Sequence, residues 1–151
     1  MNSAEYKDIM QYAINLEMEA EIFYTKVSEK VNDPYLKEMF LKFSMEEKAH
    51  REILTRLMVK EETGQYFQPA HDYGISQTIE RPRIKEDMTL ADAFALAMKN
   101  EEYAMTMYKK MADDCSDSSL KKVFEDFAAM EQGHKQNMEN FYTDVAYPEK
   151  W

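Results

Sequence analysis

Glycine, proline and cysteine are all scarce in this sequence, which has three glycines, four prolines and one cysteine among 151 residues. So few turn-forming residues exclude collagen-like and turn-rich β architectures. The 44% share of hydrophobic residues argues against a disordered chain, because it supplies enough apolar surface for a core. The single Cys115 leaves no Cys-x-x-Cys pair for a rubredoxin or zinc-ribbon module. Any metal site must therefore use Glu, Asp and His side chains.

Basic residues and long apolar runs are scarce as well. The 19 Lys and Arg residues stand against 29 Asp and Glu, and the formal net charge of −10 excludes nucleic acid as an expected partner. The longest uninterrupted apolar run covers residues 93–98, whereas a membrane span needs about 20 residues. The first residues form no apolar signal segment. We therefore expect a cytoplasmic protein with no membrane association.

The two halves of the sequence resemble each other at an offset of 84 residues. Residues 8–50 and 92–134 share 13 identical pairs without a gap. The pairs that bear on chemistry are Glu17/Glu101, Tyr24/Tyr108, Glu47/Glu131 and His50/His134. Similar composition explains matched Ala, Leu and Lys, but not both histidines and the phased glutamates, so we infer a duplication.

Apolar periodicity predicts two amphipathic helices in each half. Ala13, Glu17, Ala20 and Tyr24 follow at i, i+4, i+7 and i+11, which places them on one helical stripe, and the second half repeats the pattern. Helix starts are indicated by Asp33-Pro34, by Asp117 and by Thr89-x-x-Asp92. The expected helices cover residues 3–31, 34–63, 88–114 and 118–144.

Residues 64–87 form the one long connection, between the second and third helices. A helix of about thirty residues is roughly 45 Å long, and some two dozen extended residues can cross that distance. Phe67, His71 and Tyr73 in this linker are expected to help cover the bundle. The sequence therefore predicts an all-α single domain over residues 1–151, a ferritin-like four-helix bundle made of two duplicated hairpins. Its parts are hairpin one (3–63), the crossover linker (64–87), hairpin two (88–144) and a short tail (145–151).

The inward helix faces carry four carboxylates and two imidazoles near the middle of the helices. They are Glu17, Glu47, His50, Glu101, Glu131 and His134. An unpaired buried carboxylate costs several kcal/mol, and no Lys or Arg occurs on these faces. Two divalent cations would balance the four negative charges. The neighbouring acids Glu46, Glu52 and Glu102 point off these faces, so we expect them to be solvated.

The spacing of the six residues is typical of a dinuclear metal site. Glu47-x-x-His50 and Glu131-x-x-His134 each place a carboxylate and an imidazole on one helical face. With one Glu from each of the other two helices, this is the ligand set of di-iron and di-manganese bundles. A carboxylate-rich set with two imidazoles and no thiolate favours iron, and manganese second. We therefore expect two iron ions per chain, with manganese as the alternative.

On these motifs the sequence resembles the rubrerythrin-related branch of the ferritin-like di-iron family. The resemblance covers all four expected helices, including Ala13-Ile14-x-x-Glu17-x-x-Ala20 and its counterpart in the second half. It implies terminal ligands at Glu17 and Glu101, bridging ligands at Glu47 and Glu131, and one metal each on His50 and His134. It also makes Tyr24 and Tyr108 the candidate catalytic residues, as hydrogen-bond donors to the ligating carboxylates.

Two features depart from the family pattern. Rubrerythrins carry a further Glu ligand three residues after the third-helix Glu, where this sequence has Ala104. They also receive electrons through a Cys-rich rubredoxin domain, for which the single Cys115 does not suffice, so we expect a separate electron-donor protein. The resemblance further implies a homodimer.

The leading functional hypothesis is reduction of hydrogen peroxide or dioxygen at a dinuclear iron site, as a defence against oxidative stress. A second hypothesis is a non-catalytic protein that binds and sequesters iron, with an incidental ferroxidase step. A third is a di-iron oxygenase acting on an organic substrate. Steady peroxide turnover with an artificial reductant would distinguish the first hypothesis from the second.

Overall fold

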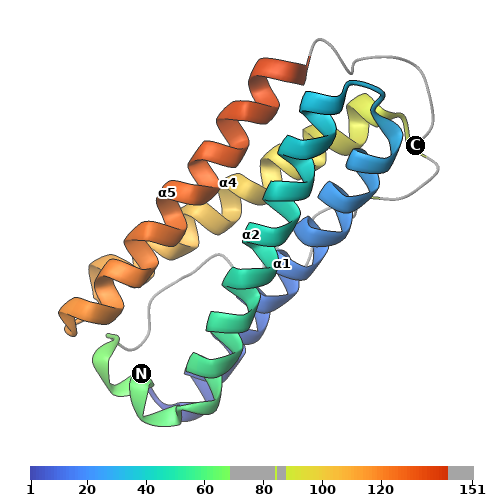
Figure 1. Cartoon of the computed structure of the whole chain (residues 1–151). Helices are drawn as coiled ribbons and strands as arrows, with labels where there is room; N and C mark the ends of the chain where they lie inside the picture. The colour runs from blue at the N-terminus through green and yellow to red at the C-terminus, as the bar shows by residue number, and fades with distance from the viewer. Residues whose placement is uncertain (69–83, 85–87, 143–151) are drawn as a thin grey trace.

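The computed structural model describes residues 1–68, 84 and 88–142, which form four long helices and one short 3₁₀ helix (Figure 1). The elements in chain order are α1 (Ser3–Lys30), α2 (Pro34–Val59), η1 (Glu61–Tyr66), α4 (Leu90–Asp114) and α5 (Ser118–Phe141). Helices α1 and α2 pack as one hairpin, and α4 and α5 pack as the other. The predicted all-α, ferritin-like bundle is confirmed. No helix in the described part of the chain is long and apolar enough to span a membrane.

Helices α2, α4 and α5 begin directly after the residues that the sequence predicts as their N-caps. The Asp33 side chain accepts hydrogen bonds from the backbone N–H groups of Tyr35 and Leu36 at the start of α2. Asp117 caps α5 in the same way, and Thr89 caps α4. These side chains satisfy N–H groups that have no partner within the first turn of a helix. Helix α4 accordingly begins at Leu90 rather than at residue 88.

Helix α2 ends earlier than predicted, at Val59 rather than at residue 63, and the chain continues as η1. A contact with the start of α1 explains the change. The Tyr6 hydroxyl donates to the Leu57 carbonyl at 3.1 Å, and Gly64 lies so close that an added Cβ would sit 3.0 Å from the Tyr6 Cβ. The glycine therefore lets the chain turn tightly over Tyr6 at the end of α2.

The ends of α2 and α4 lie together, so the connection between these helices has to span the bundle. Phe67 forms an antiparallel bridge with Cys115, and the Ser116 N–H donates to the Tyr66 carbonyl at 2.7 Å. Figure 1 shows α4 starting at the opposite end of the bundle. Phe67 is buried, as expected of a residue that covers the bundle, whereas His71 of the same linker lies outside the described residues.

Tyr73 of the linker and the tail at 145–151 also lie outside the described residues. Helix α5 ends at Phe141, short of the predicted residue 144.

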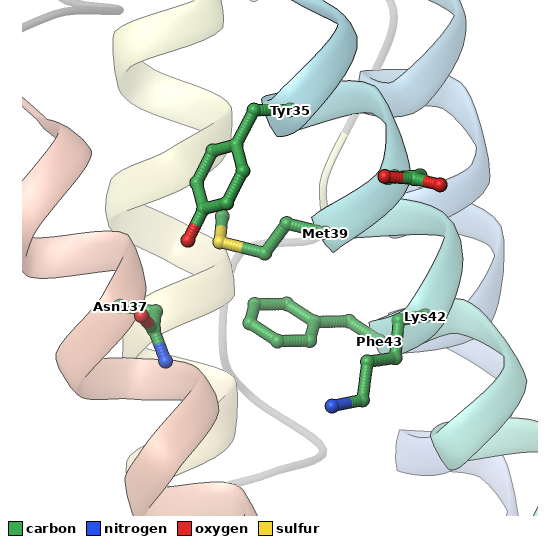
Figure 2. A pocket seen from close by; sticks show the side chains of 6 residues that line it. Tyr35, Met39, Lys42, Phe43 and Asn137 are labelled. Atoms are coloured by element: carbon green, nitrogen blue, oxygen red, sulfur yellow. The ribbon is translucent and has the colours of Figure 1, made fainter.

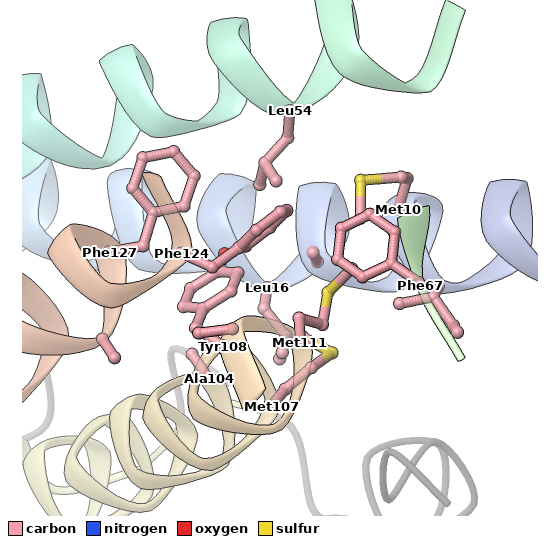
Figure 3. Packing of buried hydrophobic residues seen from close by; sticks show 14 of the residues in the cluster. Met10, Leu16, Leu54, Phe67, Ala104, Met107, Tyr108, Met111, Phe124 and Phe127 are labelled. Atoms are coloured by element: carbon pink, nitrogen blue, oxygen red, sulfur yellow. The ribbon is translucent and has the colours of Figure 1, made fainter. Parts of the chain in front are cut away.

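Two apolar clusters fill the bundle. Each long helix contributes one end to the first cluster and its other end to the second. The cluster near η1 includes Leu54, Phe67 and Phe124 (Figure 3). The other cluster includes Phe40 and Phe94, where aromatic rings meet edge to face. The polar residues predicted as ligands fall between these two clusters along every helix.

Candidate metal centre

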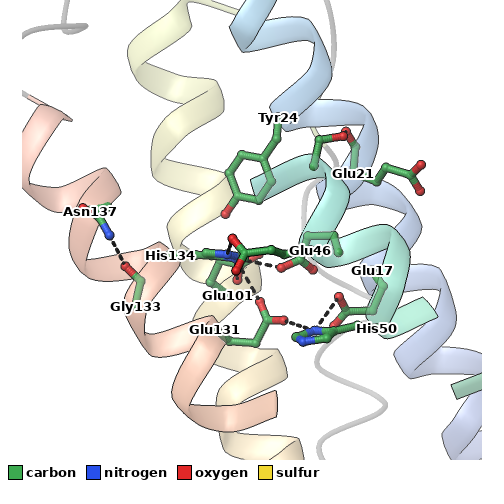
Figure 4. Close-up of polar contacts among 12 residues, drawn as sticks. Glu17, Glu21, Tyr24, Glu46, His50, Glu101, Glu131, Gly133, His134 and Asn137 are labelled. Carbon is green, nitrogen blue, oxygen red and sulfur yellow. Dashed lines mark hydrogen bonds and ion pairs between the residues drawn. The ribbon is translucent and has the colours of Figure 1, made fainter. Parts of the chain in front are cut away.

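The structure brings all six predicted ligands into one buried cluster. Figure 4 labels five of them, Glu17, His50, Glu101, Glu131 and His134, whose side chains point toward one another between the helices. One glutamate comes from α1 and one from α4, while α2 and α5 each supply a Glu-x-x-His pair. None of the six residues is more than 5% exposed. Carboxylates held this far from water require compensation by hydrogen bonds or by cations.

The cluster consists of two overlapping groups of possible ligand atoms. The first group is Glu17, Glu47, His50 and Glu131, and the second is Glu47, Glu101, Glu131 and His134. Within each group the ligand atoms all lie within 4.8 Å of one another. The two groups share Glu47 and Glu131, which are the residues that the family resemblance makes bridges. The geometry therefore suits two cations placed side by side.

Many atoms of the cluster have no hydrogen-bond partner of suitable geometry. They are Oε2 of Glu17, Glu101 and Glu131, both carboxylate oxygens of Glu47, and Nδ1 of His134. Buried polar atoms in folded proteins are nearly always hydrogen-bonded. Oxygen and nitrogen atoms that converge without donors are what a metal ion would coordinate, so the residues fit a pair of divalent cations.

Crowding of carboxylates shifts their pKa values in the metal-free cluster. Burial raises the pKa of Glu47 well above its ordinary value, and the charges of Glu101 and Glu17 raise it further. Burial and the charge of Glu101 also raise the pKa of Glu131. For Glu17, burial acts upward, but the neighbouring Glu47 and His50 outweigh it and lower the pKa. The metal-free cluster therefore retains protons that a bound metal would displace.

His50 faces carboxylates of both hairpins. Its Nδ1 lies 3.1 Å from Oε1 of Glu131 and 3.5 Å from Oε2 of Glu17. The imidazole ring stacks on Phe127 with ring centroids 4.1 Å apart. These contacts fix the ring with Nδ1 directed at the cluster.

His134 repeats this arrangement in the other half of the cluster. Its Nδ1 lies 2.7 Å from Oε1 of Glu47 and 3.7 Å from Oε2 of Glu101. Its ring packs on Phe43, the counterpart of Phe127, with ring centroids 4.2 Å apart. The duplication inferred from the sequence therefore appears as an approximate twofold relation between the two histidines.

The two predicted tyrosines lie beside the cluster in different settings. The Tyr108 hydroxyl donates to Oε1 of Glu17 at 2.5 Å, as expected for a donor to a ligating carboxylate. The Tyr24 hydroxyl donates to the Met138 sulfur at 3.8 Å, a long contact with a weak acceptor. Burial raises the pKa of both tyrosines well above the ordinary value, assisted by Glu17 at Tyr108 and by Glu101 at Tyr24. Both hydroxyls therefore stay protonated.

Glu46 belongs to the surroundings of the cluster, although the sequence predicts it to be solvated. Its Oε1 lies 3.3 Å from Nε2 of His134, and its side chain is 26% exposed. The hydrogen bond with His134 lowers the pKa of Glu46 against an opposing effect of burial. The internal repeat offers no signal for this contact, because the corresponding residue of the second half is Met130. The prediction for Glu46 was therefore wrong.

A groove of about 490 Å³ lies between α2 and α5, next to the His134 half of the cluster (Figure 2). Tyr35, Met39 and Lys42 line it on α2, and Asn137 faces them from α5. Phe43 also lines the groove and packs against the ring of His134. The Phe43 side chain therefore touches both the groove and the cluster.

Comparison with known proteins places the chain in a family. The family model described as Rubrerythrin matches residues 8–142. A crystal structure of a candidate ferritin-like diiron-carboxylate protein from Thermotoga maritima superposes with a TM-score of 0.69 at 24% identity, covering 92% of this chain and 95% of that chain. A hypothetical protein from Pyrococcus furiosus gives a TM-score of 0.68 at 23% identity, covering 97% and 93%. No curated protein matches the chain. Both structures share the fold, and the family match over most of the sequence shows that the chain belongs to the rubrerythrin family.

Proposed function

We propose that the protein binds two iron ions in this cluster and reduces hydrogen peroxide or dioxygen with electrons from a separate donor. The observation that carries the proposal is the pair of overlapping ligand groups, which share Glu47 and Glu131. Glu17 and His50 would complete the set for one ion. Glu101 and His134 would complete the set for the other.

The chemistry of the ligands supports iron. Four carboxylates and two imidazoles without a thiolate suit iron, with manganese as the alternative. Two divalent ions would neutralise the four carboxylates, and neutral imidazoles would leave the buried centre without net charge. This neutralisation removes the cost of burying Glu131, which is 0% exposed.

Reduction of one hydrogen peroxide molecule to two waters takes two electrons and two protons. A pair of Fe(II) ions supplies the two electrons when bound, one from each ion. The chain itself supplies a dry, closed setting, because the apolar clusters cover the centre on both sides. The Tyr108 and Tyr24 hydroxyls keep protons next to the carboxylates, since burial raises the pKa of both. Tyr108 also holds Glu17 in place through its hydrogen bond.

The proposal includes a separate electron donor, a cytoplasmic location and a homodimer. The sequence has one cysteine, the buried Cys115, which cannot build a redox module by itself. Exposed apolar side chains on the first hairpin, including Ile22 at 53% and Met45 at 71% exposed, offer a surface for a second copy. Sedimentation velocity of the metal-loaded protein tests the dimer, and a single monomeric species would contradict it.

Turnover of hydrogen peroxide tests the proposed reaction. The protein is loaded with Fe(II) under anaerobic conditions and mixed with hydrogen peroxide and an artificial reductant. Many peroxide molecules consumed per chain would support the proposal. Consumption that ends after one equivalent per iron pair, with reductant still present, would favour iron sequestration. Glu139→Ala serves as a matched control, because Glu139 lies on α5 but is 51% exposed and pairs with Lys135.

A further inference from the structure

The approximate symmetry of the cluster breaks at the outer nitrogen of the histidines. Nε2 of His134 lies 3.3 Å from Oε1 of Glu46. Within the described part of the chain, Nε2 of His50 has no hydrogen-bond partner. The reason lies in the sequence, because the residue that corresponds to Glu46 in the second half is Met130. Both positions are half-buried, so they differ in chemistry rather than in access to solvent.

A hydrogen bond at Nε2 determines how a histidine can bind a metal. A neutral imidazole carries one proton, and an acceptor at Nε2 keeps the proton on that nitrogen. The Nδ1 lone pair of His134 is then available to a metal ion, on the side of the ring where Nδ1 lies 2.7 Å from Oε1 of Glu47. A carboxylate that accepts from a ligating histidine also makes the imidazole a stronger ligand, typically by a factor of 10 to 100 in metal affinity.

The two tyrosines also differ between the halves, but this difference does not cancel the stronger metal binding expected at His134. Tyr108 donates to Glu17, whereas Tyr24 donates to the Met138 sulfur. The Tyr108 bond orients Glu17 but occupies one of its oxygens, and Oε2 of Glu17 remains without a partner. It therefore positions a ligand in the His50 half without increasing the charge available to a metal there.

We propose that Glu46 makes the two metal positions unequal, so that the position served by His134 binds a divalent ion first and more tightly. This inference depends on the metal pair of the proposed function. Glu46 acts through His134, as a positioning residue. Two unequal positions would load in a defined order, with the ion beside the α2–α5 groove bound before the ion beside His50.

Stepwise binding of cobalt(II) to the metal-free protein tests the inference. We expect two binding steps whose affinities differ about 10- to 100-fold, followed by visible absorption and by calorimetry. Glu46→Met, which copies the residue found at position 130, should bring the two steps together by weakening the tighter one. Glu46→Gln keeps an acceptor of the same shape and should retain part of the difference. Glu52→Met is the matched control, since Glu52 is exposed on the same helix.

The opposite substitution, at the corresponding position of the second half, should raise the affinity for the metal. Met130→Glu supplies the missing carboxylate to the His50 half and should tighten the weaker step. The zinc-loaded protein gives a readout that does not depend on redox activity. NMR should show a slowly exchanging Nε2 proton on His134 in the wild type and in Glu52→Met, but not in Glu46→Met.

The possible results separate this inference from the proposed function. Two equal binding steps that Glu46→Met leaves unchanged would overturn the inference and leave the metal pair intact. The absence of cobalt binding would overturn both. Unequal steps that merge in Glu46→Met and persist in Glu52→Met would support the assignment of Glu46.

Discussion

The Tyr108 hydroxyl on α4 lies 2.5 Å from Oε1 of Glu17 on α1. This hydrogen bond joins the two hairpins through the buried centre, next to the point where Nδ1 of His50 lies 3.5 Å from Oε2 of Glu17. Hydrogen bonds to ionised carboxylates are stronger than neutral ones, and removal of one partner leaves a buried charge uncompensated. Tyr24 occupies the equivalent place in the other half, but its hydroxyl donates to the Met138 sulfur at 3.8 Å.

The two tyrosines should therefore respond differently to removal of the hydroxyl. Tyr108→Phe should lower the free energy of unfolding of the metal-free protein by about 1–3 kcal/mol, because Glu17 loses its donor. Tyr24→Phe should cost less than about 1 kcal/mol, since a long contact to sulfur is weak. Urea unfolding of both variants measures the difference. A larger loss for Tyr24→Phe would contradict the assignment of these hydrogen bonds.

Glu131 belongs to both ligand groups, so its removal should disable the whole centre. Glu131→Ala should reduce bound metal below two ions per chain and abolish peroxide turnover. The helices should persist, because the substitution removes a buried carboxylate and retains helix-forming character. Metal analysis, activity and circular dichroism measure the three effects. Glu139→Ala should leave all three unchanged, and retained turnover in Glu131→Ala would refute the role of Glu131.

Metal binding should stabilise the fold, because the unfolded chain does not hold the six ligands together. A metal at 100 times its dissociation constant adds about 2.7 kcal/mol to stability. For a chain of this size, that corresponds to a rise in Tm of roughly 5–10 °C. Thermal unfolding with and without Fe(II) under anaerobic conditions measures the shift. Identical Tm values would contradict a buried metal centre.

The stability of the metal-free protein should fall as pH rises from about 6.5 to 9. Burial acts to lower the pKa of His134, but the carboxylates of Glu101, Glu46 and Glu47 beside its ring outweigh burial and raise the pKa from 6.5 to about 11. The folded protein thus holds a proton that the unfolded chain releases near its ordinary pKa. Glu47 and Glu131, whose pKa values are raised chiefly by burial, change stability in the same direction.

Each extra proton held by the folded state lowers stability by about 1.4 kcal/mol per pH unit in this window. The lowered pKa values of Glu17 and Glu46 act below pH 4.5 and so do not offset the effect. Urea unfolding at several pH values measures the slope. Bound metal should remove the slope, because the ligands are then deprotonated in the folded protein as they are in the unfolded chain. A metal-free protein that becomes more stable towards pH 9 would contradict the pKa directions.

Local patterns in the sequence were sufficient to predict the helices, their caps and the six residues of the cluster. Glu47 and His50 could be found because helical spacing alone places them on one face. The Glu46–His134 contact could not be predicted from the sequence. It depends on the direction in which Nε2 of His134, on another helix, points. The early end of α2 likewise depends on Tyr6, which is distant in sequence from Gly64 and adjacent only in the folded chain.

The number of metal ions bound per chain tests the central claim most directly. The protein is loaded with Fe(II) under anaerobic conditions, freed of unbound metal by gel filtration and measured by mass spectrometry of the metal against protein concentration. The overlapping ligand groups around Glu47 and Glu131 predict two iron ions per chain. Less than one ion per chain would contradict a dinuclear centre and would require another explanation for six buried, converging Glu and His side chains.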